Sequence, residues 1–236
     1  MLEIKNVTKK YGKKTAIDNI SITVKDGEIF GFVGPNGAGK TTLIKSIVGI
    51  HQFDEGDIII NKTSILDNDV LCKSITAYIP DNPDVYPNLK GIEYLNFIAD
   101  IYEISNEERN ELIKKYADIF DLTQNLGDQI SSYSHGMRQK LVIISALIHK
   151  PKLLVLDEPF VGLDPKSSKI LKDIMKELTT NKTTIFFSSH VLEVVEKLCD
   201  RVGIINEGKI IALDNTKNLK GNEDLEKIFL KLTNEK

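Results

Sequence analysis

One glycine-rich segment of the sequence has the residue types and spacing of a phosphate-binding loop. It follows the pattern G-x-x-x-x-G-K-[ST] and reads Gly34, Pro35, Asn36, Gly37, Ala38, Gly39, Lys40 and Thr41, with Thr42 next in the chain. Glycines let consecutive backbone N–H groups converge on phosphate oxygens, and the positive end of a following helix favours the same anion. Lys40 would reach the β- and γ-phosphates, and the Thr41 hydroxyl would bind Mg²⁺. The glycine spacing does not fit the G-x-G-x-x-G pattern of a dinucleotide-binding turn.

A pair of carboxylates at the end of an apolar run could supply the rest of the chemistry of nucleotide hydrolysis. Residues 153–156 are apolar and are followed directly by Asp157 and Glu158. A parallel sheet places the end of such a strand at the edge where phosphates bind. Asp157 could there hold Mg²⁺, and Glu158 could orient and deprotonate the attacking water. Taken alone, the same residues would equally fit a solvated turn closed by Pro159.

The pattern of apolar residues predicts the elements that position these groups. Alternation with a period of two over residues 2–7 and 20–24 predicts half-buried strands of an antiparallel layer. The apolar run 29–33 predicts a buried strand directly before the glycine-rich segment, and residues 41–48 have helical spacing directly after it. A strand, a loop and a helix would therefore carry the phosphate site.

Strand and helix patterns alternate again in the second half of the chain. They predict strands at 152–156, 183–187 and 202–205 and helices at 167–178 and 191–198. This alternation is typical of a parallel sheet with helices on both faces. Residues from about 85 to 150 show helical stripes instead, and Ser105 and Glu108 have the spacing of a capping box. The polar tail from residue 215 is expected to end in a short helix that contains Leu225, Ile228, Phe229 and Leu232.

Composition and charge argue against several other classes of protein. The 236 residues include 31 Lys and Arg against 34 Asp and Glu, a net charge of −3, and 41% are hydrophobic. This balance is typical of a globular domain and argues against sequence-independent nucleic-acid binding, which needs a basic face. Cys72 and Cys199 form no CxxC pair, so we expect two buried reduced thiols. No apolar run approaches the roughly 20 residues of a membrane-spanning helix, and the N-terminus lacks the pattern of an export signal.

Three further segments resemble, in order along the chain, the motifs of one family. They are Tyr133-Ser134-His135-Gly136-Met137-Arg138-Gln139, Val161-Gly162-Leu163-Asp164-Pro165 and Phe186-Phe187-Ser188-Ser189-His190. With the phosphate loop and the acidic pair, they resemble the nucleotide-binding domain of ATP-binding cassette (ABC) transporters over most of the chain. The first is similar to the signature of stand-alone export-type members, the second to the D-loop and the third to the switch-histidine segment. Singly, each also fits a local role, such as a helix N-cap for Ser134.

The resemblance implies how these segments would meet ATP. In that family the signature of one subunit covers the γ-phosphate held by the phosphate loop of another, so Ser134 and Gly136 would bind ATP across a dimer interface. A hydroxyl and an N–H group at a helix N-terminus suit such an anion. His190 would hydrogen-bond the γ-phosphate and act in catalysis with Glu158 and Lys40. Tyr11 fits the aromatic residue that stacks on adenine, and an exposed hairpin tyrosine is the alternative.

One position departs from the family pattern. After the predicted strand 75–79 the family usually carries a Gln that ligates Mg²⁺ and links to the membrane partner, whereas this chain has Asp81 after Pro80. Export-type members often carry an acidic residue there, usually Glu. Asp is shorter than Gln or Glu by one C–C bond, about 1.5 Å, so Asp81 could bind Mg²⁺ through water instead of directly.

The resemblance also implies a fold and its partners. We expect one ABC ATPase domain over residues 1–236: an α/β phosphate-loop (P-loop) NTPase core with a mostly parallel sheet, an N-terminal antiparallel β layer and an inserted helical subdomain. The core would comprise residues 1–84 and 151–214, the helical subdomain about 85–150, and the tail 215–236. The domain would hydrolyse ATP with Mg²⁺ as a dimer with a second ATPase subunit, most simply a homodimer. It would drive a separate integral membrane permease from the cytoplasmic face, for export and without a nucleic-acid partner.

Two other functions would also fit a phosphate loop in this sequence. A soluble ABC-type ATPase that remodels nucleic acid or ribosomes is the alternative, although such relatives usually carry two cassettes or long coiled-coil insertions, which this sequence lacks. A kinase or GTPase with a phosphate loop is disfavoured by the ordered signature, D-loop and His190 segments. A guanine-reading Asn-Lys-x-Asp segment is also missing.

Overall fold

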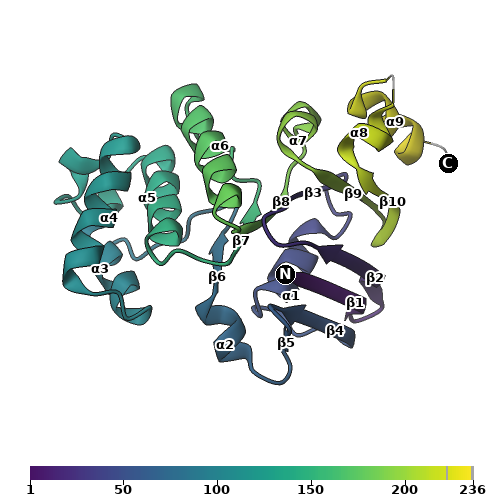
Figure 1. Cartoon of the computed structure of the whole chain (residues 1–236), viewed down its shortest axis with the longest axis horizontal. Helices are drawn as coiled ribbons and strands as arrows, with labels where there is room; N and C mark the ends of the chain where they lie inside the picture. Colours follow the sequence, from purple (N-terminus) through teal and green to yellow (C-terminus); the bar gives the residue numbers. More distant parts are fainter. Residues whose placement is uncertain (222, 235–236) are drawn as a thin grey trace.

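The central element of the protein is a six-stranded sheet whose strands are ordered β10-β9-β3-β8-β7-β6. The protein is described by a computed structural model, which covers residues 1–221 and 223–234 (Figure 1). The strands are β3 (Ile29–Val33), β6 (Thr76–Ile79), β7 (Leu153–Asp157), β8 (Thr184–Ser188), β9 (Arg201–Asn206) and β10 (Lys209–Asn215). All neighbours pair in parallel except β10, which pairs antiparallel with β9. The predicted mostly parallel sheet is confirmed, and β10 is an edge strand that the sequence analysis did not predict.

A second sheet is antiparallel and has the order β2-β1-β4-β5. It consists of β1 (Leu2–Tyr11), β2 (Lys14–Val24), β4 (Glu55–Ile60) and β5 (Thr63–Ser64). Buried and exposed residues alternate along β2, as expected for a strand with one face on the core. The predicted N-terminal antiparallel layer is confirmed, and β4 and β5 extend it.

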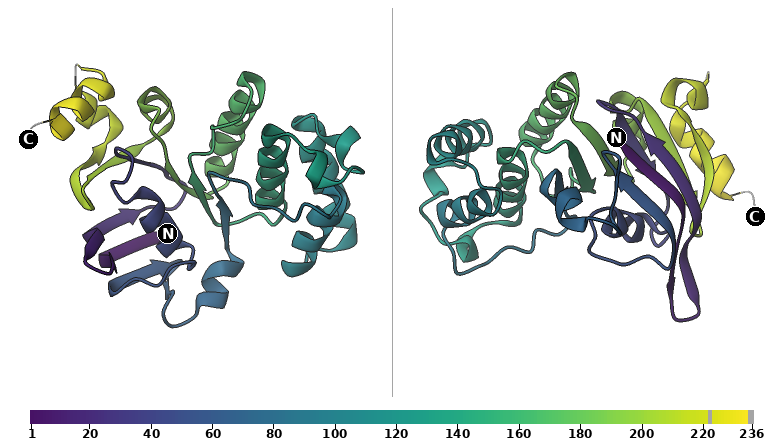
Figure 2. Two further views of the ribbon diagram at one scale, coloured as in Figure 1. Left: turned by 180° about the vertical axis from the view of Figure 1, so that it is seen from behind. Right: turned by 60° about the horizontal axis from the view of Figure 1, so that its bottom comes forward.

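The helices lie on both faces of the six-stranded sheet and at both ends of the molecule. They are α1 (Lys40–Ile47), α2 (Asp69–Ser74), α3 (Gly91–Ile101), α4 (Asn106–Ile119), α5 (His135–Ile148), α6 (Pro165–Thr180), α7 (Leu192–Leu198), α8 (Thr216–Lys220) and α9 (Leu225–Asn234), with short 3₁₀ turns at Thr123–Asn125 and Ile130–Ser132. Two further views agree that α3 and α4 lie at the end opposite to α8 and α9 (Figure 2). None of these helices has the length and apolar character needed to cross a bilayer.

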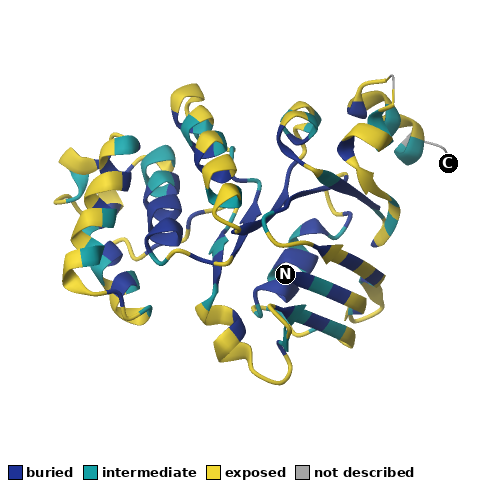
Figure 3. Ribbon diagram, in the orientation of Figure 1, coloured by how far each residue is buried: buried dark blue, intermediate teal, exposed yellow. Residues whose placement is uncertain are grey.

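Two apolar cores explain why the central strands read as nearly continuous apolar runs. Phe186 of β8 faces the core shared with α1 and the antiparallel sheet, whereas Ile185 and Phe187 face the core shared with α5, α6 and α7. All residues of β3, β7 and β8 are buried, which Figure 3 shows as the dark centre of the molecule. Strands buried on both faces carry apolar residues at nearly every position. Polar residues follow these apolar strands at the rigid carboxyl edge of the sheet.

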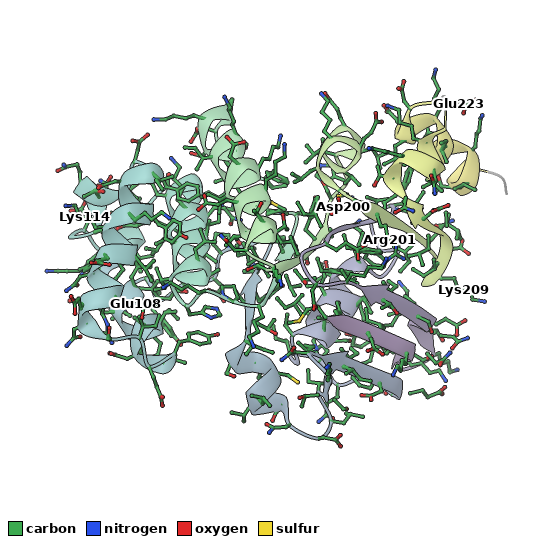
Figure 4. All side chains as sticks on the ribbon, in the orientation of Figure 1. Glu108, Lys114, Asp200, Arg201, Lys209 and Glu223 are labelled. Carbon is green, nitrogen blue, oxygen red and sulfur yellow. The ribbon has the colours of Figure 1, made fainter. Side chains whose placement is uncertain are left out.

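The strand that leads into the phosphate loop is anchored at its start by β9. The Ile29 N–H group donates to Asp200 Oδ2 at 2.9 Å. Arg201, which is labelled with Asp200 in Figure 4, pairs with Glu28 at 3.1 Å and lies over the ring of Phe30. These contacts hold the amino end of β3, so the loop at its carboxyl end is fixed relative to the sheet.

Some local expectations were correct only in part. The Ser105 hydroxyl caps α4 by accepting from the Glu108 N–H group at 3.2 Å, but the Glu108 carboxylate pairs with Lys150 instead of returning to Ser105. Only half of the expected capping box therefore forms.

Both cysteines are free and buried, as predicted. Helix α9 contains the four apolar residues that predicted a helix in the tail.

Candidate nucleotide site

Two adjoining cavities lie at the carboxyl edge of the six-stranded sheet. One has a volume of about 340 Å³ and contains the phosphate loop, Tyr11 and the acidic pair. The other, of about 470 Å³, lies beside it and contains His190. Asn36, Asp81 and Glu158 line both cavities. The structure thus brings together Tyr11, the phosphate loop, Asp81, the acidic pair and His190, which come from five separate segments of the sequence, around two cavities that share part of their lining.

The phosphate loop is wedged between two strands, which explains its glycines. A Cβ atom on Gly34 would lie 2.3 Å from the Ile205 carbonyl oxygen, and one on Gly39 would lie 2.5 Å from that of Ala16. Gly39 also has a φ of +113°, in the region that favours glycine. A side chain at either position would push the loop out of its place before α1.

Lys40 is buried and folds back over the phosphate loop. Its Nζ atom donates to the carbonyl oxygens of Gly34 at 2.6 Å and Pro35 at 3.3 Å. Burial lowers the pKa of the Lys40 ammonium, although the charges of Glu158 and Asp157 oppose this shift. The ammonium is therefore held between the loop and the acidic pair, where a phosphate of the nucleotide would lie.

The two carboxylates at the end of β7 have different environments. Asp157 is 1% exposed, and its Oδ1 atom accepts from the Ser188 hydroxyl at 2.5 Å. Its Oδ2 atom is buried and has no hydrogen-bond partner among the residues that the structure describes. A buried carboxylate oxygen without a partner is unfavourable unless a cation or another donor meets it. Asp157 therefore presents one free oxygen.

Glu158 occupies a strained turn directly after Asp157. Its φ is +48°, which a residue with a side chain adopts at a free-energy cost of about 1–3 kcal/mol. The Glu158 N–H group donates to the Ser188 hydroxyl at 3.1 Å. Its carboxylate accepts from the His190 N–H group at 3.2 Å and lies 2.9 Å from His190 Nδ1. Since an ionised carboxylate only accepts, His190 Nδ1 carries the proton of this hydrogen bond.

The signature segment lies outside both cavities. Ser134 is the N-cap of α5 and accepts from the Met137 N–H group at 3.2 Å. The His135 ring instead lies against Gly162 of the D-loop. A Cβ atom added to Gly162 would be only 2.3 Å from the Cδ2 atom of His135. Neither Ser134 nor Gly136 lines the two cavities. Within one chain, the structure does not bring the signature to the phosphate loop.

Comparison with known proteins identifies the family. The family model described as "ABC transporter" matches residues 17–161. The chain belongs to this family. An ABC transporter ATP-binding protein of Bacillus subtilis, YhcH, is 39% identical over 219 residues, 92% of this chain and 71% of the relative. The linearmycin resistance ATP-binding protein LnrL of B. subtilis is 38% identical, over 93% of this chain and 70% of the relative.

Further relatives match nearly end to end. The lantibiotic transport ATP-binding protein SrtF of Streptococcus pyogenes is 35% identical over 97% of this chain and 96% of its own. A solved ATP-binding subunit of an ABC transporter superposes with a TM-score of 0.94 at 30% identity, covering 98% of this chain and 99% of the other. The dimeric cassette MJ0796 bound to ADP and Pi, at 23% identity and a TM-score of 0.83, shares the fold. This protein is an ABC ATPase domain that binds nucleotide.

Sequence reasoning missed several residues of this ABC ATPase site. Ser188 hydrogen-bonds the Asp157 carboxylate and the Glu158 backbone N–H group. Ser189 and the α9 residue Phe229 line the larger cavity, and Lys14 lines the smaller. A polar residue at the end of the apolar strand β8 was the one available signal for Ser188. Phe229 carries no motif, and only the folded arrangement brings it to the cavity.

Proposed function

We propose that this ABC ATPase domain binds Mg-ATP between two copies of the chain and drives a separate membrane permease in the direction of export. The observation that carries the proposal is the division of the ATP-binding groups. The phosphate loop, the acidic pair and His190 share two cavities, whereas the signature is an exposed helix N-terminus outside them. A second copy placed head to tail would supply the missing anion site to each cavity. The names of SrtF and LnrL, which concern lantibiotic transport and linearmycin resistance, support export.

In this proposal the groups of one chain hold the nucleotide at both ends. The backbone N–H groups of residues 36–42 and the Lys40 ammonium bind the phosphates. Tyr11 lines the same cavity and is 46% exposed, so its ring is accessible for stacking on adenine. Ser134 and Gly136 of the second copy cover the γ-phosphate.

The residues of the smaller cavity fit a magnesium ion. Asp157 Oδ2 is a buried oxygen that no residue in the described part of the chain hydrogen-bonds, and Thr41 and Asp81 line the same cavity. Carboxylate, hydroxyl and water oxygens are the ligands that Mg²⁺ prefers in nucleotide sites. When bound, the ion would neutralise charge on the phosphates. Asp157 and Thr41 would hold it, and Asp81 could hold it through water.

Glu158 is the proposed general base. Its carboxylate is only 17% exposed and faces the space shared by both cavities. It orients a water molecule toward the γ-phosphate and accepts its proton. His190 holds this carboxylate in place through two hydrogen bonds and lies beside the γ-phosphate. Loss of that phosphate removes the contacts that favour the closed dimer, so the closed population falls.

Residues 85–150 are the proposed helical subdomain that docks the permease, between core segments 1–84 and 151–214 and before the tail 215–236. Tyr86 and Phe97 pack edge to face at a ring separation of 5.9 Å and are 57% and 43% exposed. Ile101, also on α3, is 57% exposed. An exposed apolar group of this kind, close to Asp81 along the chain, suits contact with a membrane protein at the cytoplasmic face.

A capture experiment tests this proposal. Tagged Glu158→Gln protein is incubated with Mg-ATP and detergent-solubilised membranes of the source organism, and co-purifying proteins are identified by mass spectrometry. A multi-span membrane protein is expected, retained by Glu158→Gln and lost in the double variant Glu158→Gln/Phe97→Asp. The exposed-surface variant Glu158→Gln/Lys169→Asp serves as the matched control and should retain it. Recovery of ribosomal or DNA-associated proteins alone would favour a soluble remodelling ATPase.

A further inference from the structure

Ser188 is a buried residue whose hydroxyl hydrogen-bonds the Asp157 carboxylate and the Glu158 backbone N–H group. It is 0% exposed at the end of β8, and it lies directly opposite Asp157 in the register of β7 and β8. Its Oγ atom lies 2.5 Å from Asp157 Oδ1 and 3.1 Å from the Glu158 backbone nitrogen. None of the motifs considered above assigns a role to this residue.

The direction of both hydrogen bonds is fixed by their partners. A serine hydroxyl has one proton to donate and lone pairs that accept. The Asp157 carboxylate accepts and the Glu158 N–H group donates, so the hydroxyl must donate to the first and accept from the second. Alanine could form neither bond, and a buried cysteine would form weaker ones.

These two bonds have separate consequences for the acidic pair. The bond to Asp157 occupies Oδ1 and orients the carboxylate, so that Oδ2 is the oxygen available to a cation. The bond to the Glu158 N–H group secures a turn whose φ of +48° is strained. The same strand end also supplies the His190 N–H group that holds the Glu158 carboxylate. Glu158 is thus fixed by β8 at its main chain and at its side chain.

We propose that Ser188 is a positioning residue that sets which Asp157 oxygen faces the magnesium ion and holds Glu158 in its strained turn. This inference rests on the proposed function of the site. Residues that hydrogen-bond a metal-binding carboxylate from behind orient it, and their loss typically lowers metal affinity or activity about 10- to 100-fold. Ser188 acts through Asp157 and Glu158 and does not itself touch the nucleotide.

The test separates metal-dependent from metal-independent nucleotide binding. The dissociation constant of a fluorescent ATP analogue, mant-ATP, is measured with Mg²⁺ and with EDTA for wild type and for Ser188→Ala. The phosphate loop is unchanged in the variant, so its affinity in EDTA should equal that of wild type. The tightening produced by Mg²⁺ should fall about 10-fold, and turnover should fall about 10- to 100-fold.

Two further variants distinguish the proposed effect of Ser188→Ala from a general loss of structure. Ser145→Ala removes another buried serine hydroxyl, which donates to the Val142 carbonyl of its own helix, and it should retain the full response to Mg²⁺. Ser188→Thr keeps a hydroxyl at the same position and should keep most of the Mg²⁺ response. If Ser188→Ala binds with the wild-type Mg²⁺ response, or if Ser188→Thr binds in EDTA but loses that response as fully as alanine does, the assignment is wrong.

The wild-type measurement separates this inference from the proposal on which it rests. If wild type binds mant-ATP equally with Mg²⁺ and with EDTA and does not hydrolyse ATP, the proposed function fails and the role of Ser188 fails with it. If wild type responds to Mg²⁺ and hydrolyses ATP while Ser188→Ala behaves identically, only the role of Ser188 is rejected.

Discussion

The phosphate loop and the signature segment share one local arrangement, a helix N-terminus that can bind an anion, but their surroundings differ. Each places a polar N-terminus of a helix, α1 after Gly39 and α5 after Ser134, where free N–H groups and the helix dipole attract an anion. At α1 the adjoining Lys40 is buried, with carboxylates and a cavity around it. At α5 the cap residue Ser134 is exposed, and the next residue, His135, lies against Gly162 of the D-loop.

This difference shows which of the two sites has its phosphate-binding and catalytic groups within one chain and which does not. The first site gathers a cation, acidic residues and a hydrogen-bonding histidine, which are the parts needed to bind and cleave a phosphoanhydride. The second offers anion-binding groups, Ser134 and Gly136, that line neither of the two cavities. A helix N-terminus of that kind contributes to catalysis only when another molecule brings a phosphate to it, so the comparison predicts effects confined to one chain for the first site and shared by two chains for the second.

The first of the two largest expected effects is that of Glu158→Gln on the first site. Removal of the general base should lower turnover about 10²- to 10⁴-fold, while ATP binding persists because the phosphate loop is intact. Since ATP is then not consumed, the protein should accumulate as a dimer. Phosphate release and light scattering after gel filtration with Mg-ATP measure the two results. Turnover within about twofold of wild type would exclude Glu158 as the base.

Ser134→Arg should abolish turnover through the second site while each chain still binds ATP. The bulky cation would block the approach of the signature to the partner's γ-phosphate, and the phosphate loop would be unaffected. Steady-state phosphate release and mant-ATP binding measure the two effects. Surviving turnover would show that the signature does not act across the interface.

A mixing experiment sharpens the same comparison. Ser134→Arg and Lys40→Ala are each inactive in this scheme, yet a dimer of one chain of each holds one cavity whose loop and facing signature are both intact. Turnover should therefore reappear when the two proteins are mixed. If the mixture stays as inactive as its components, then the two sites do not complement each other between chains.

The parts of the site that the sequence predicted are those determined by neighbours along the chain. The phosphate loop is recognisable because its glycines are required by the close approach of Ile205 and Ala16, and β3 because strands buried on both faces must be apolar. Such steric and burial requirements produce a recognisable pattern of residue types in the local sequence. The conformation and spacing then follow from steric limits that any chain must obey.

The parts that escaped prediction depend on pairing across the fold. Ser188 gains its role from a register that places it opposite Asp157, 31 residues away. Phe229 reaches the cavity only because α9 packs on α7, where Glu196 accepts from the Leu225 N–H group at 3.1 Å. Strands β4 and β10 mix exposed and half-buried residues, so their sequences carry a weaker signal than those of the central strands.

Lys40→Ala should weaken nucleotide binding by a smaller factor than the loss of turnover in Glu158→Gln. Hydrogen bonds to charged groups contribute about 1.5–3 kcal/mol, which corresponds to a loss of about 10- to 100-fold in affinity. Titration with mant-ATP in EDTA isolates this effect from the metal. Lys169→Ala, a change at an exposed lysine that lines neither cavity, is the matched control and should leave the affinity unchanged. Equal affinities for wild type and Lys40→Ala would refute the proposed role of the lysine.

The smallest expected effect concerns the contact between the D-loop and the signature helix α5, which Asp164 makes. Asp164 caps α6 by accepting from the Ser167 N–H group at 2.8 Å and the Ser167 hydroxyl at 2.7 Å, and it pairs with Lys140 of α5 at 3.1 Å. The Ser167 hydrogen bonds, followed by the nearby Lys140, hold the pKa of Asp164 well below its usual value. A lowered pKa in the folded state means that this carboxylate stabilises the fold above the ordinary pKa of Asp, and that the contribution is lost as pH falls below it. Asp164→Ala should therefore lower the free energy of unfolding by about 1 kcal/mol near neutral pH, the usual effect of a lost N-cap.

Urea unfolding of wild type and Asp164→Ala from pH 7 down to about pH 2 measures this contribution. The difference between the two proteins should stay nearly constant down to about pH 5 and narrow below about pH 4, where Asp164 takes up a proton more readily in the unfolded chain than in the folded one. Asp173→Ala, an exposed change on the same helix, should alter stability by less than about 0.5 kcal/mol. A difference that stays constant with pH would mean that the carboxylate charge does not stabilise this join, and that the signature helix is held to the D-loop by packing such as that of His135 on Gly162.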